Sequence, residues 1–411
     1  MIVLYRDIKN KQARGYHMIA LLLALIYLAF IGLGLPDSLL GSAWPIMHLQ
    51  LGAQLSYAGI VTMIVAGGTI VSSLLSDRIT RRLGAGLTTA IGLLMAATAM
   101  FGFSNSSAFW MLCLWAIPYG LAAGTIDAAL NNYVALHFSS RYMSWLHSFW
   151  GVGAVISPYI MGFSLTRGLG WETGYFSVSM IQVGIAAVMF ASLPLWKKNK
   201  GGAPPPEERG KALSLPQILK IKGVKLVLPA FFAYCAAEAT TMLWAVSYLV
   251  YQRGIAAETA ASYGALFFWG VMVGRFLGGF IADKAGDRNM IRGSVAIMLT
   301  GIVMIMLPVN IDMVSLTGLV ILGLGCATIY PSIIHSTPAN FGEENSRAII
   351  GVQMAGAYTG STFIPPLFGL IANRITGIGI YPAFILGFVL LLLLMTELLN
   401  RTVDKQMTND K

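Results

Sequence analysis

Long apolar runs separated by short polar segments dominate the chain of 411 residues. A helix that crosses a bilayer needs about 20 mostly apolar residues. The period-two alternation typical of barrel strands is absent. We therefore predict an all-α integral membrane protein with twelve transmembrane helices, at residues 17–47, 55–76, 86–104, 107–137, 141–166, 173–196, 224–251, 258–282, 290–309, 312–337, 347–372 and 377–399.

Charged residues are scarce along the chain. Hydrophobic residues make up 56% of it and charged residues 11%, and the mean hydropathy is +0.72. A soluble protein of this length would need far more charge to cover its surface. We therefore predict a multi-pass protein of the cell membrane, either plasma or inner membrane, with the lipid bilayer as a partner.

The net charge of +10 could suggest a nucleic-acid partner, but the charge follows the predicted loops instead. With the N-terminus in the cytoplasm, 23 of the 27 lysines and arginines fall in cytoplasmic segments. Arg167, Arg253 and Arg374 fall in outer loops, and Arg275 lies within a span. This bias follows the positive-inside rule. It predicts that both termini face the cytoplasm and argues against binding to nucleic acid.

No pattern points to an enzyme or to a bound cofactor. The sequence shows no Ser–His–Asp order, no metal-ligand cluster and no phosphate-binding loop. Cys113, Cys235 and Cys326 fall in predicted spans without metal-ligand spacing, so we interpret them as small apolar packing residues. We expect no enzymatic activity, no metal and no cofactor.

One long polar segment divides the chain at residues 197–222, KKNKGGAPPPEERGKALSLPQILKIK. Its prolines, glycines and charges predict a cytoplasmic linker that is partly flexible and whose end forms a short surface helix. We accordingly predict an N-terminal six-helix bundle at 1–196 and a C-terminal six-helix bundle at 223–411.

The two halves look duplicated, because similar residues recur in the same order at a nearly constant offset. A duplicated six-helix unit is typical of secondary transporters, whose substrate site lies near the midplane between the halves. The matched pairs are Asp77/Asp283 and Arg141/Arg347 at 206 residues, Gly153/Gly360, Pro158/Pro365 and Gly162/Gly369 at 207, and Thr125/Thr328 at 203.

The segments SLLSDRITRR and GGFIADKAGDR resemble the loop signature of the major facilitator superfamily. The second copy keeps Gly279 and Gly286, whereas the first has Ser73 and Thr80 in place of glycines. The resemblance covers essentially the whole chain. It implies that family's fold and a cytoplasmic gate of ion pairs between helix ends; ordinary flanking charge is the alternative. The residues it assigns to the gate are Asp77, Arg78, Arg81, Arg82, Asp283 and Arg288.

Four ionisable side chains inside predicted spans are candidates for function: Asp37, Asp127, Glu238 and Arg275. A charge at the bilayer centre costs about 2.5–3.5 kcal/mol on insertion scales, so such residues are functional hypotheses by default. Asn131 follows Asp127 by four residues and shares its helix face. A carboxylate beside an amide suits a hydroxyl-rich ligand. The alternative is an acid that is paired within the helix bundle.

Asp37 lies in the stretch GLPDSLLGSAWP, on a helix face that it shares with Gly41 and Trp44. Pro36 removes a backbone donor and should loosen the helix locally, so that freed carbonyls line a cavity. The competing interpretation places Asp37 near the outer surface, where water hydrates it.

Glu238 shares its helix face with Tyr234 and Thr241, and it either serves transport or is a buried acid paired within its half. Arg275 precedes Asp283 by eight residues. Its run GRFLGGFIAD commonly leads into the loop signature in this superfamily. We therefore assign Arg275 to gating or packing, with substrate contact as the second possibility.

His147 and Gln353 lie 206 residues apart at matching positions of the two halves. We predict that they face each other across the pseudo-twofold axis; packing is the alternative. His335 is a weaker candidate near the end of a span. Trp150 and Trp244 join Trp44 as candidates for stacking on a sugar or an organic cation, with interface or packing roles as the competing interpretation.

Three segments narrow the resemblance: LPDSLLGSAWP, DAALNNY and LHSFWGVGA are similar to runs of the fucose–galactose–glucose:proton symporters. The matching residues are Asp37, then Asp127 with Asn131, then His147. The chain departs from that family because Asp127 stands for a glutamate and His147 for an amide, and histidine titrates near neutral pH. This resemblance implies proton symport of a hexose-like sugar.

We therefore expect a secondary active transporter that works by alternating access, takes up a small polar solute with protons and functions as a monomer. Either Asp127 or Asp37 carries the proton, and the other binds sugar hydroxyls. The candidate proton-coupling residues are Asp37, Asp127 and Glu238. The candidate substrate-binding residues are Asp37, Trp44, Asp127, Asn131, His147, Trp150, Glu238, Trp244 and Gln353.

The alternative function is proton-coupled efflux of organic cations or drugs, because three acids and several aromatic rings also suit a cation. Asn131, Asn132, His147 and Gln353 argue against it, since they are many polar groups for a promiscuous apolar pocket. A membrane sensor that transports nothing is a third reading, but the polar segments are too short to signal by themselves.

Overall fold

The computed structural model describes residues 2–138, 140–198, 215–308 and 311–409 as an all-helical protein. The helices of the N-terminal half are α1 (Ile2–Asp37), α2 (Leu39–Gln50), η1 (Leu55–Tyr57), α3 (Ala58–Leu83), α4 (Ala85–Ser104), α5 (Phe109–His137), α6 (Ser140–Thr166), α7 (Gly170–Ala191) and α8 (Leu193–Lys198).

The second half begins with α9 (Leu215–Lys220), the short helix expected at the end of the linker; residues 199–214 lie outside the described part of the chain. It continues with α10 (Val224–Tyr251), α11 (Ala257–Tyr263), α12 (Ala265–Ala285), α13 (Asp287–Met306), α14 (Asp312–Cys326), α15 (Ile329–His335), α16 (Thr337–Phe341), α17 (Glu343–Ile371), η2 (Ala372–Thr376), η3 (Ile378–Ile380) and α18 (Tyr381–Asn409).

Eleven helical segments of the described residues are long and apolar enough to cross a membrane. The predicted span at 347–372 corresponds to α17, which has 29 residues but is not among the eleven. Polar side chains such as Thr359, Ser361 and Thr362 dilute its hydropathy. The count of twelve transmembrane helices therefore stays a prediction.

The first predicted span is interrupted rather than continuous. Helix α1 ends at Asp37, and α2 begins at Leu39, with Ser38 between them. The break lies two residues after Pro36, whose nitrogen donates no hydrogen bond to the preceding turn. It places Asp37 at the end of a helix, in the interior of the protein.

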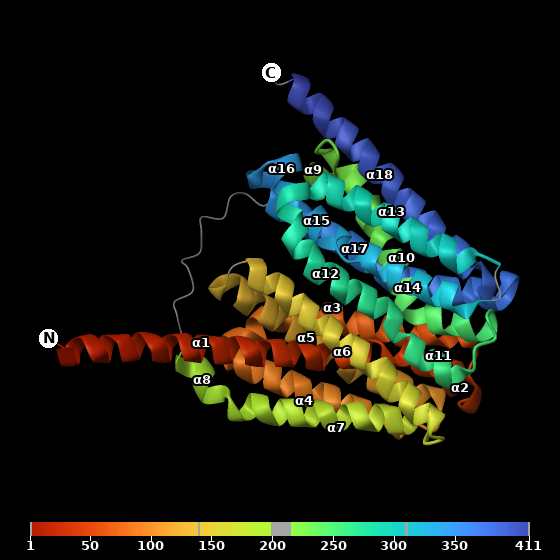
Figure 1. The fold of residues 1–411 in the computed structure, drawn as a ribbon, viewed down its shortest axis with the longest axis horizontal. Coiled ribbons are helices and arrows are strands. Elements are labelled where there is room, and N and C mark those ends of the chain that lie inside the picture. Colours follow the sequence, from red (N-terminus) through yellow and green to blue (C-terminus); the bar gives the residue numbers. More distant parts are fainter. Residues whose placement is uncertain (1, 139, 199–214, 309–310, 410–411) are drawn as a thin grey trace.

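The helices form two groups that pack in the same way. In the first half α1 packs on α6, α3 on α5, and α4 on α5 and α7; in the second half α10 packs on α17, α12 on α14, and α13 on α14 and α18. The two groups meet where α2 and α11 lie, and both termini lie away from that end (Figure 1). The domain limits 1–196, 197–222 and 223–411 remain predictions.

Among the residues that the structure describes, four hydrogen bonds join the two halves, and they lie at the end formed by α2 and α11, which we call the closed end. One of them runs from Trp269 of α12 to the hydroxyl of Tyr159 of α6 at 3.2 Å. Another runs from Asn373 of η2 to Gln54 at 3.3 Å. In this conformation the halves are therefore held together at one end.

Glycine lets α1 and α6 cross closely. A Cβ atom on Gly153 would lie 2.2 Å from the carbonyl oxygen of Ile31, and one on Gly34 would lie 2.1 Å from that of Trp150. Backbone atoms cannot yield as a flexible side chain can, so any larger residue forces the two helices apart.

We expect Gly153→Leu to destabilise the protein by about 1–3 kcal/mol or more, because overpacking separates α1 from α6. The measurement is the midpoint of thermal unfolding in detergent. Gly184→Leu is the matched control, since Gly184 is a helical glycine with no atom within 4 Å of an added Cβ. Equal unfolding midpoints for the two variants would contradict the close crossing.

Candidate functional site

The close helix crossing of the first half recurs in the second half. Gly153 of α6 meets the carbonyl oxygen of Ile31 of α1, and Gly360 of α17 meets that of Phe232 of α10. A Cβ atom would lie 2.2 Å away in the first case and 2.4 Å in the second. Phe232 follows Ile31 by 201 residues. Positions of α1 and α10 that differ by 201 are therefore equivalent in the two halves.

Asp37 and Glu238 differ by the same 201 residues, so they are the counterparts of each other in the duplicated unit. Both line a single cavity of about 400 Å³. The other lining residues come from both halves: Pro36, Leu40, Val61, Thr62, Val65, Ala66, Thr69, Met100, Phe103, Tyr119, Tyr175, Cys235, Ala239, Met242, Tyr330, Met354, Ala357, Tyr358, Ser361 and Thr362.

The carboxylate of Asp37 receives two neutral donors from its own half. The hydroxyl of Tyr119 of α5 donates to one carboxylate oxygen. The indole N–H of Trp150 of α6 donates to the other at 2.7 Å. Acceptance of one hydrogen bond by each oxygen is the arrangement expected for an ionised carboxylate. Asp37 is half-buried and faces the cavity, so it remains within reach of a solute or a proton.

Glu238 has a cation as its partner instead. The guanidinium of Arg275 of α12 lies 3.6 Å from its carboxylate, and both side chains are less than one-fifth exposed. The same guanidinium lies over the ring of Trp150, 5.5 Å from the ring centroid, in a cation–π contact. Trp150 therefore touches Asp37 with its N–H and Arg275 with its face, which connects the two carboxylates across the interface between the halves.

Asp127 lies on α5, outside the residues that line the cavity. The amide of Asn131 donates to its carboxylate at 2.8 Å and to its backbone carbonyl at 3.0 Å. The predicted pairing of these two residues on one helix face is present. Tyr330 and Tyr358 line the cavity from the second half.

His147 and Gln353 each contact a residue of their own half, and the prediction that they face each other stays a prediction. The ring of His147 packs edge-on against Phe30, with the ring centroids 5.8 Å apart. Gln353 is fully buried, and its side-chain oxygen accepts a hydrogen bond from Thr337 at 3.1 Å. Neither residue lines the cavity, and their contact with substrate stays a prediction.

Two of the three candidate tryptophans are fully buried in helix packing. The indole N–H of Trp44 donates to the carbonyl of Leu55 at 2.7 Å, and that of Trp244 donates to the carbonyl of Pro365 at 2.8 Å. Neither lines the cavity. The stacking roles predicted for them remain untested, and Trp150 is the tryptophan that the structure connects to the two carboxylates.

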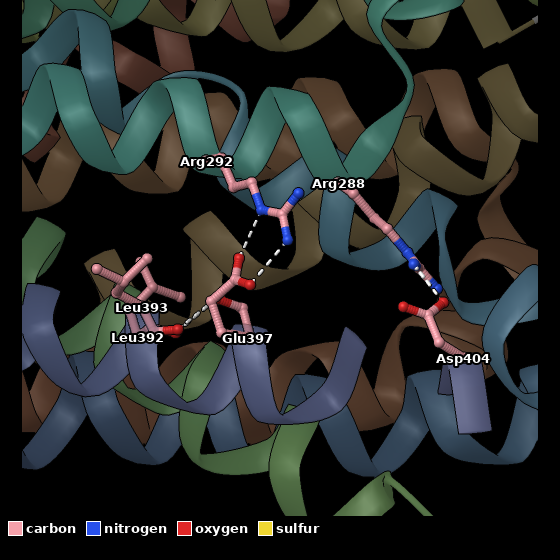
Figure 2. A network of polar contacts seen from close by, with 7 residues as sticks. Arg288, Arg292, Leu392, Leu393, Glu397 and Asp404 are labelled. Atoms are coloured by element: carbon pink, nitrogen blue, oxygen red, sulfur yellow. Dashed lines mark hydrogen bonds and ion pairs between the residues drawn. The ribbon is translucent and has the colours of Figure 1, made fainter. Parts of the chain in front are cut away.

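The predicted gate lies partly outside the described side chains: those of Asp77, Arg78, Arg81 and Asp283 are not described, and Arg82 is exposed. Arg288 pairs within the second half, with Asp404 of α18 at 2.6 Å (Figure 2). Arg292 makes a two-pronged pair with Glu397 one turn further along α13, at 2.6 and 2.8 Å (Figure 2). The gating role stays a prediction.

His335 pairs with Asp287 at 2.8 Å with its side chain largely exposed, so it lies away from the cavity. Among the described residues no group of three or more histidines, cysteines, aspartates or glutamates is placed to hold a metal ion. Sequence reasoning missed Tyr119, although it precedes Asp127 by eight residues and lies two helical turns away on the same face.

A family model described as Major Facilitator Superfamily matches residues 26–353 and 226–408. The chain belongs to the Major Facilitator Superfamily. As in that family, it is a multi-pass membrane transporter that binds a small-molecule substrate in the lipid bilayer. The narrower resemblance to the fucose–galactose–glucose:proton symporters has no such support and stays a prediction.

Relatives within the superfamily are distant. A cis,cis-muconate transport protein from Acinetobacter baylyi is 23% identical over 89% of this chain and 90% of that protein. A hexuronate transporter from Bacillus subtilis is 23% identical over 65% of each chain. Bypass of stop codon protein 6 from Saccharomyces cerevisiae is 24% identical over 62% of this chain, which covers 56% of the yeast protein.

Solved structures of the superfamily share the fold of this chain. A bacterial homologue of the human lysosomal transporter Spinster, inward-facing and unoccupied, superposes with a TM-score of 0.68 at 14% identity and covers 94% of this chain and 98% of that chain. A mutant of the nucleoside transporter NupG gives a TM-score of 0.70 at 12% identity, over 92% and 98%. At these identities the likeness concerns the fold alone.

We expect Arg275→Gln to destabilise this transporter by about 3 kcal/mol, because it leaves Glu238 buried without its cation. The double variant Arg275→Gln with Glu238→Gln should recover most of the loss, since no uncompensated charge remains. The measurement is thermal unfolding in detergent. A double variant as unstable as Arg275→Gln alone would mean that the pair is not what stabilises this region.

Proposed function

We propose that this transporter moves a hexose-like sugar together with protons, by symport and alternating access. The observation that carries the proposal is the cavity of about 400 Å³ that both halves line, each contributing one carboxylate. Its volume lies in the range of small-molecule sites. A site between the halves, near the midplane, is where a secondary transporter binds its solute.

The chemistry of the lining favours a neutral polyhydroxylated solute. The described lining residues include four tyrosines and four serines or threonines, beside Asp37 and Glu238. These groups supply the donors and acceptors that sugar hydroxyls need. The lining residues include no lysine or arginine, and Arg275 already neutralises Glu238. This lining therefore suits a neutral sugar better than an organic anion or an organic cation.

We assign the proton to Asp37. Glu238 has a cation beside it, so its charge is compensated and has little reason to change during transport. Asp127 lies outside the cavity lining and accepts a hydrogen bond from Asn131. Asp37 faces the cavity with only neutral donors, so protonation changes the net charge of the site. We infer that Asp127, with its partner Asn131, acts in binding the solute rather than in carrying the proton.

If both termini face the cytoplasm, as the charge distribution predicts, the closed end is the outer end. The conformation is then shut to the outside, with Asp37 in the ionised form that follows release of its proton to the inside. Rocking of the halves about the site would open the outer end and bring the predicted gate residues together at the cytoplasmic end.

The test is uptake into proteoliposomes with an imposed pH gradient, using a panel of neutral hexoses, sugar acids and organic cations, with sodium gradients in parallel. We expect accumulation of a neutral hexose driven by an inward proton gradient. Exchange of the cations for protons, with no movement of sugar, would refute the sugar assignment and support efflux.

Two variants separate proton transfer from solute binding. Asp37→Asn should abolish proton-driven accumulation but keep exchange of labelled for unlabelled sugar, because exchange requires no proton release. Asp127→Asn should lower the apparent affinity in both assays. Asp312→Asn is the matched control, since Asp312 is exposed at the start of α14. Accumulation by Asp37→Asn at the wild-type level would remove Asp37 from the coupling step.

A further inference from the structure

The closed end contains a histidine in a hydrogen-bonded chain that spans both halves. His48, in the last turn of α2, is buried with 7% exposure. Its Nδ1 lies 3.0 Å from the carbonyl oxygen of Ala53, and its Nε2 lies 2.7 Å from the hydroxyl oxygen of Tyr251, at the end of α10. That hydroxyl also lies 3.0 Å from the carbonyl oxygen of Pro45.

The hydrogens available for these three hydrogen bonds can be counted. Three contacts need one hydrogen each, and both end groups are carbonyl oxygens that only accept. A neutral imidazole supplies one hydrogen and the Tyr251 hydroxyl supplies one, so one contact would bring two lone pairs together. A protonated imidazole supplies two. All three contacts are then filled: His48 donates to Ala53 and to Tyr251, and Tyr251 donates to Pro45.

We propose that His48 is a second proton-binding site, which stabilises the closed end when occupied. The ligand is a proton, and the site is complete only with residues of both halves in place, because His48 and Pro45 belong to α2 and Tyr251 to α10. Opening this end separates His48 from Tyr251. The site is distinct from Asp37, and it stands whether or not the solute is a sugar.

The ionisable neighbours fit a histidine that changes charge. Of the described groups at this end of the elements packed on α2, Tyr251 is the one that touches the ring. Glu172 lies in the first turn of α7 and Glu258 in the first turn of α11. Arg253 follows α10 and pairs with Asp312 at 3.7 Å.

The consequence is a closed end that responds to acidity. Protonation of His48 fills all three hydrogen bonds of this group and favours the closed conformation. Loss of the proton removes one hydrogen bond that the charged ring donates, and it favours opening. Such a bond is strong enough to change the ratio of closed to open molecules roughly tenfold or more. If this end faces outward, acid outside would favour its closure, a step that proton symport needs after loading.

The test measures the closed fraction by electron–electron resonance between spin labels on the exposed residues Leu169 and Met313, which lie at this end in opposite halves. The three native cysteines are replaced by alanine in this background. No solute is required. We expect the short-distance population of the parent to rise roughly tenfold relative to the open one between about pH 8 and about pH 5.5.

His48→Gln should abolish this pH dependence. Tyr251→Phe should abolish it and also lower the closed fraction, because it removes the hydroxyl that joins the halves. His137→Gln is the matched control: His137 is exposed at the other end of α5, and its variant should keep the full pH response. A flat response in the parent, or an unchanged response in His48→Gln, overturns the proposal.

Nitrogen NMR of histidine-labelled protein provides a second readout if His48→Gln fails to fold. The proposal requires both ring nitrogens of His48 to carry hydrogen at acidic pH, with its signal identified by comparison with Tyr251→Phe, which perturbs the ring environment. A neutral His48 ring in the closed population at about pH 5.5 would overturn the proposal. Failure of sugar transport in the proteoliposome assay leaves this outcome unaffected.

Discussion

A charge buried among apolar helices must have partners, and this constraint organises the centre of the protein. Asp37 and Glu238 lie at equivalent positions of two helix crossings, each made possible by a glycine that admits the neighbouring backbone. Their partners come from helices that are distant in sequence: Tyr119 and Trp150 for Asp37, and Arg275 for Glu238. Packing and charge pairing therefore specify the same arrangement of helices.

Duplication gives the two halves equal geometry but different chemistry. Neutral donors surround the carboxylate of the first half, and a cation neutralises that of the second. Two compensated charges would be inert, and two uncompensated ones would be too costly inside a membrane. Among the described side chains of the cavity, Asp37 is the carboxylate without a cation beside it. Trp150 contacts both sides, Asp37 through its N–H and Arg275 through its ring face.

The closed end is held by a different kind of interaction from those in the cavity. Its contacts between the halves use ring nitrogens, hydroxyls, side-chain amides and a backbone carbonyl instead of ion pairs. Separation of the halves at these contacts would break hydrogen bonds but would part no carboxylate from its cation. The ion pairs of Arg288 and Arg292, by contrast, lie within the second half and join α13 to α18 (Figure 2).

The sequence by itself determined the class of protein. The thickness of the bilayer sets the length of the apolar runs, and the cost of placing charge in it keeps charged residues scarce. The sequence also indicated the duplication, the superfamily and the buried acids, since each depends on residues that are local or regularly repeated. Only the tertiary structure decided which acids share a cavity, that Tyr119 and Trp150 hold Asp37, and that Arg275 belongs to Glu238. The offset of 201 that relates Asp37 to Glu238 differs from the 203, 206 and 207 of the other matched pairs. Segments of different length intervene in the two halves, so only the crossing of α1 with α6 and of α10 with α17 shows which residues are equivalent.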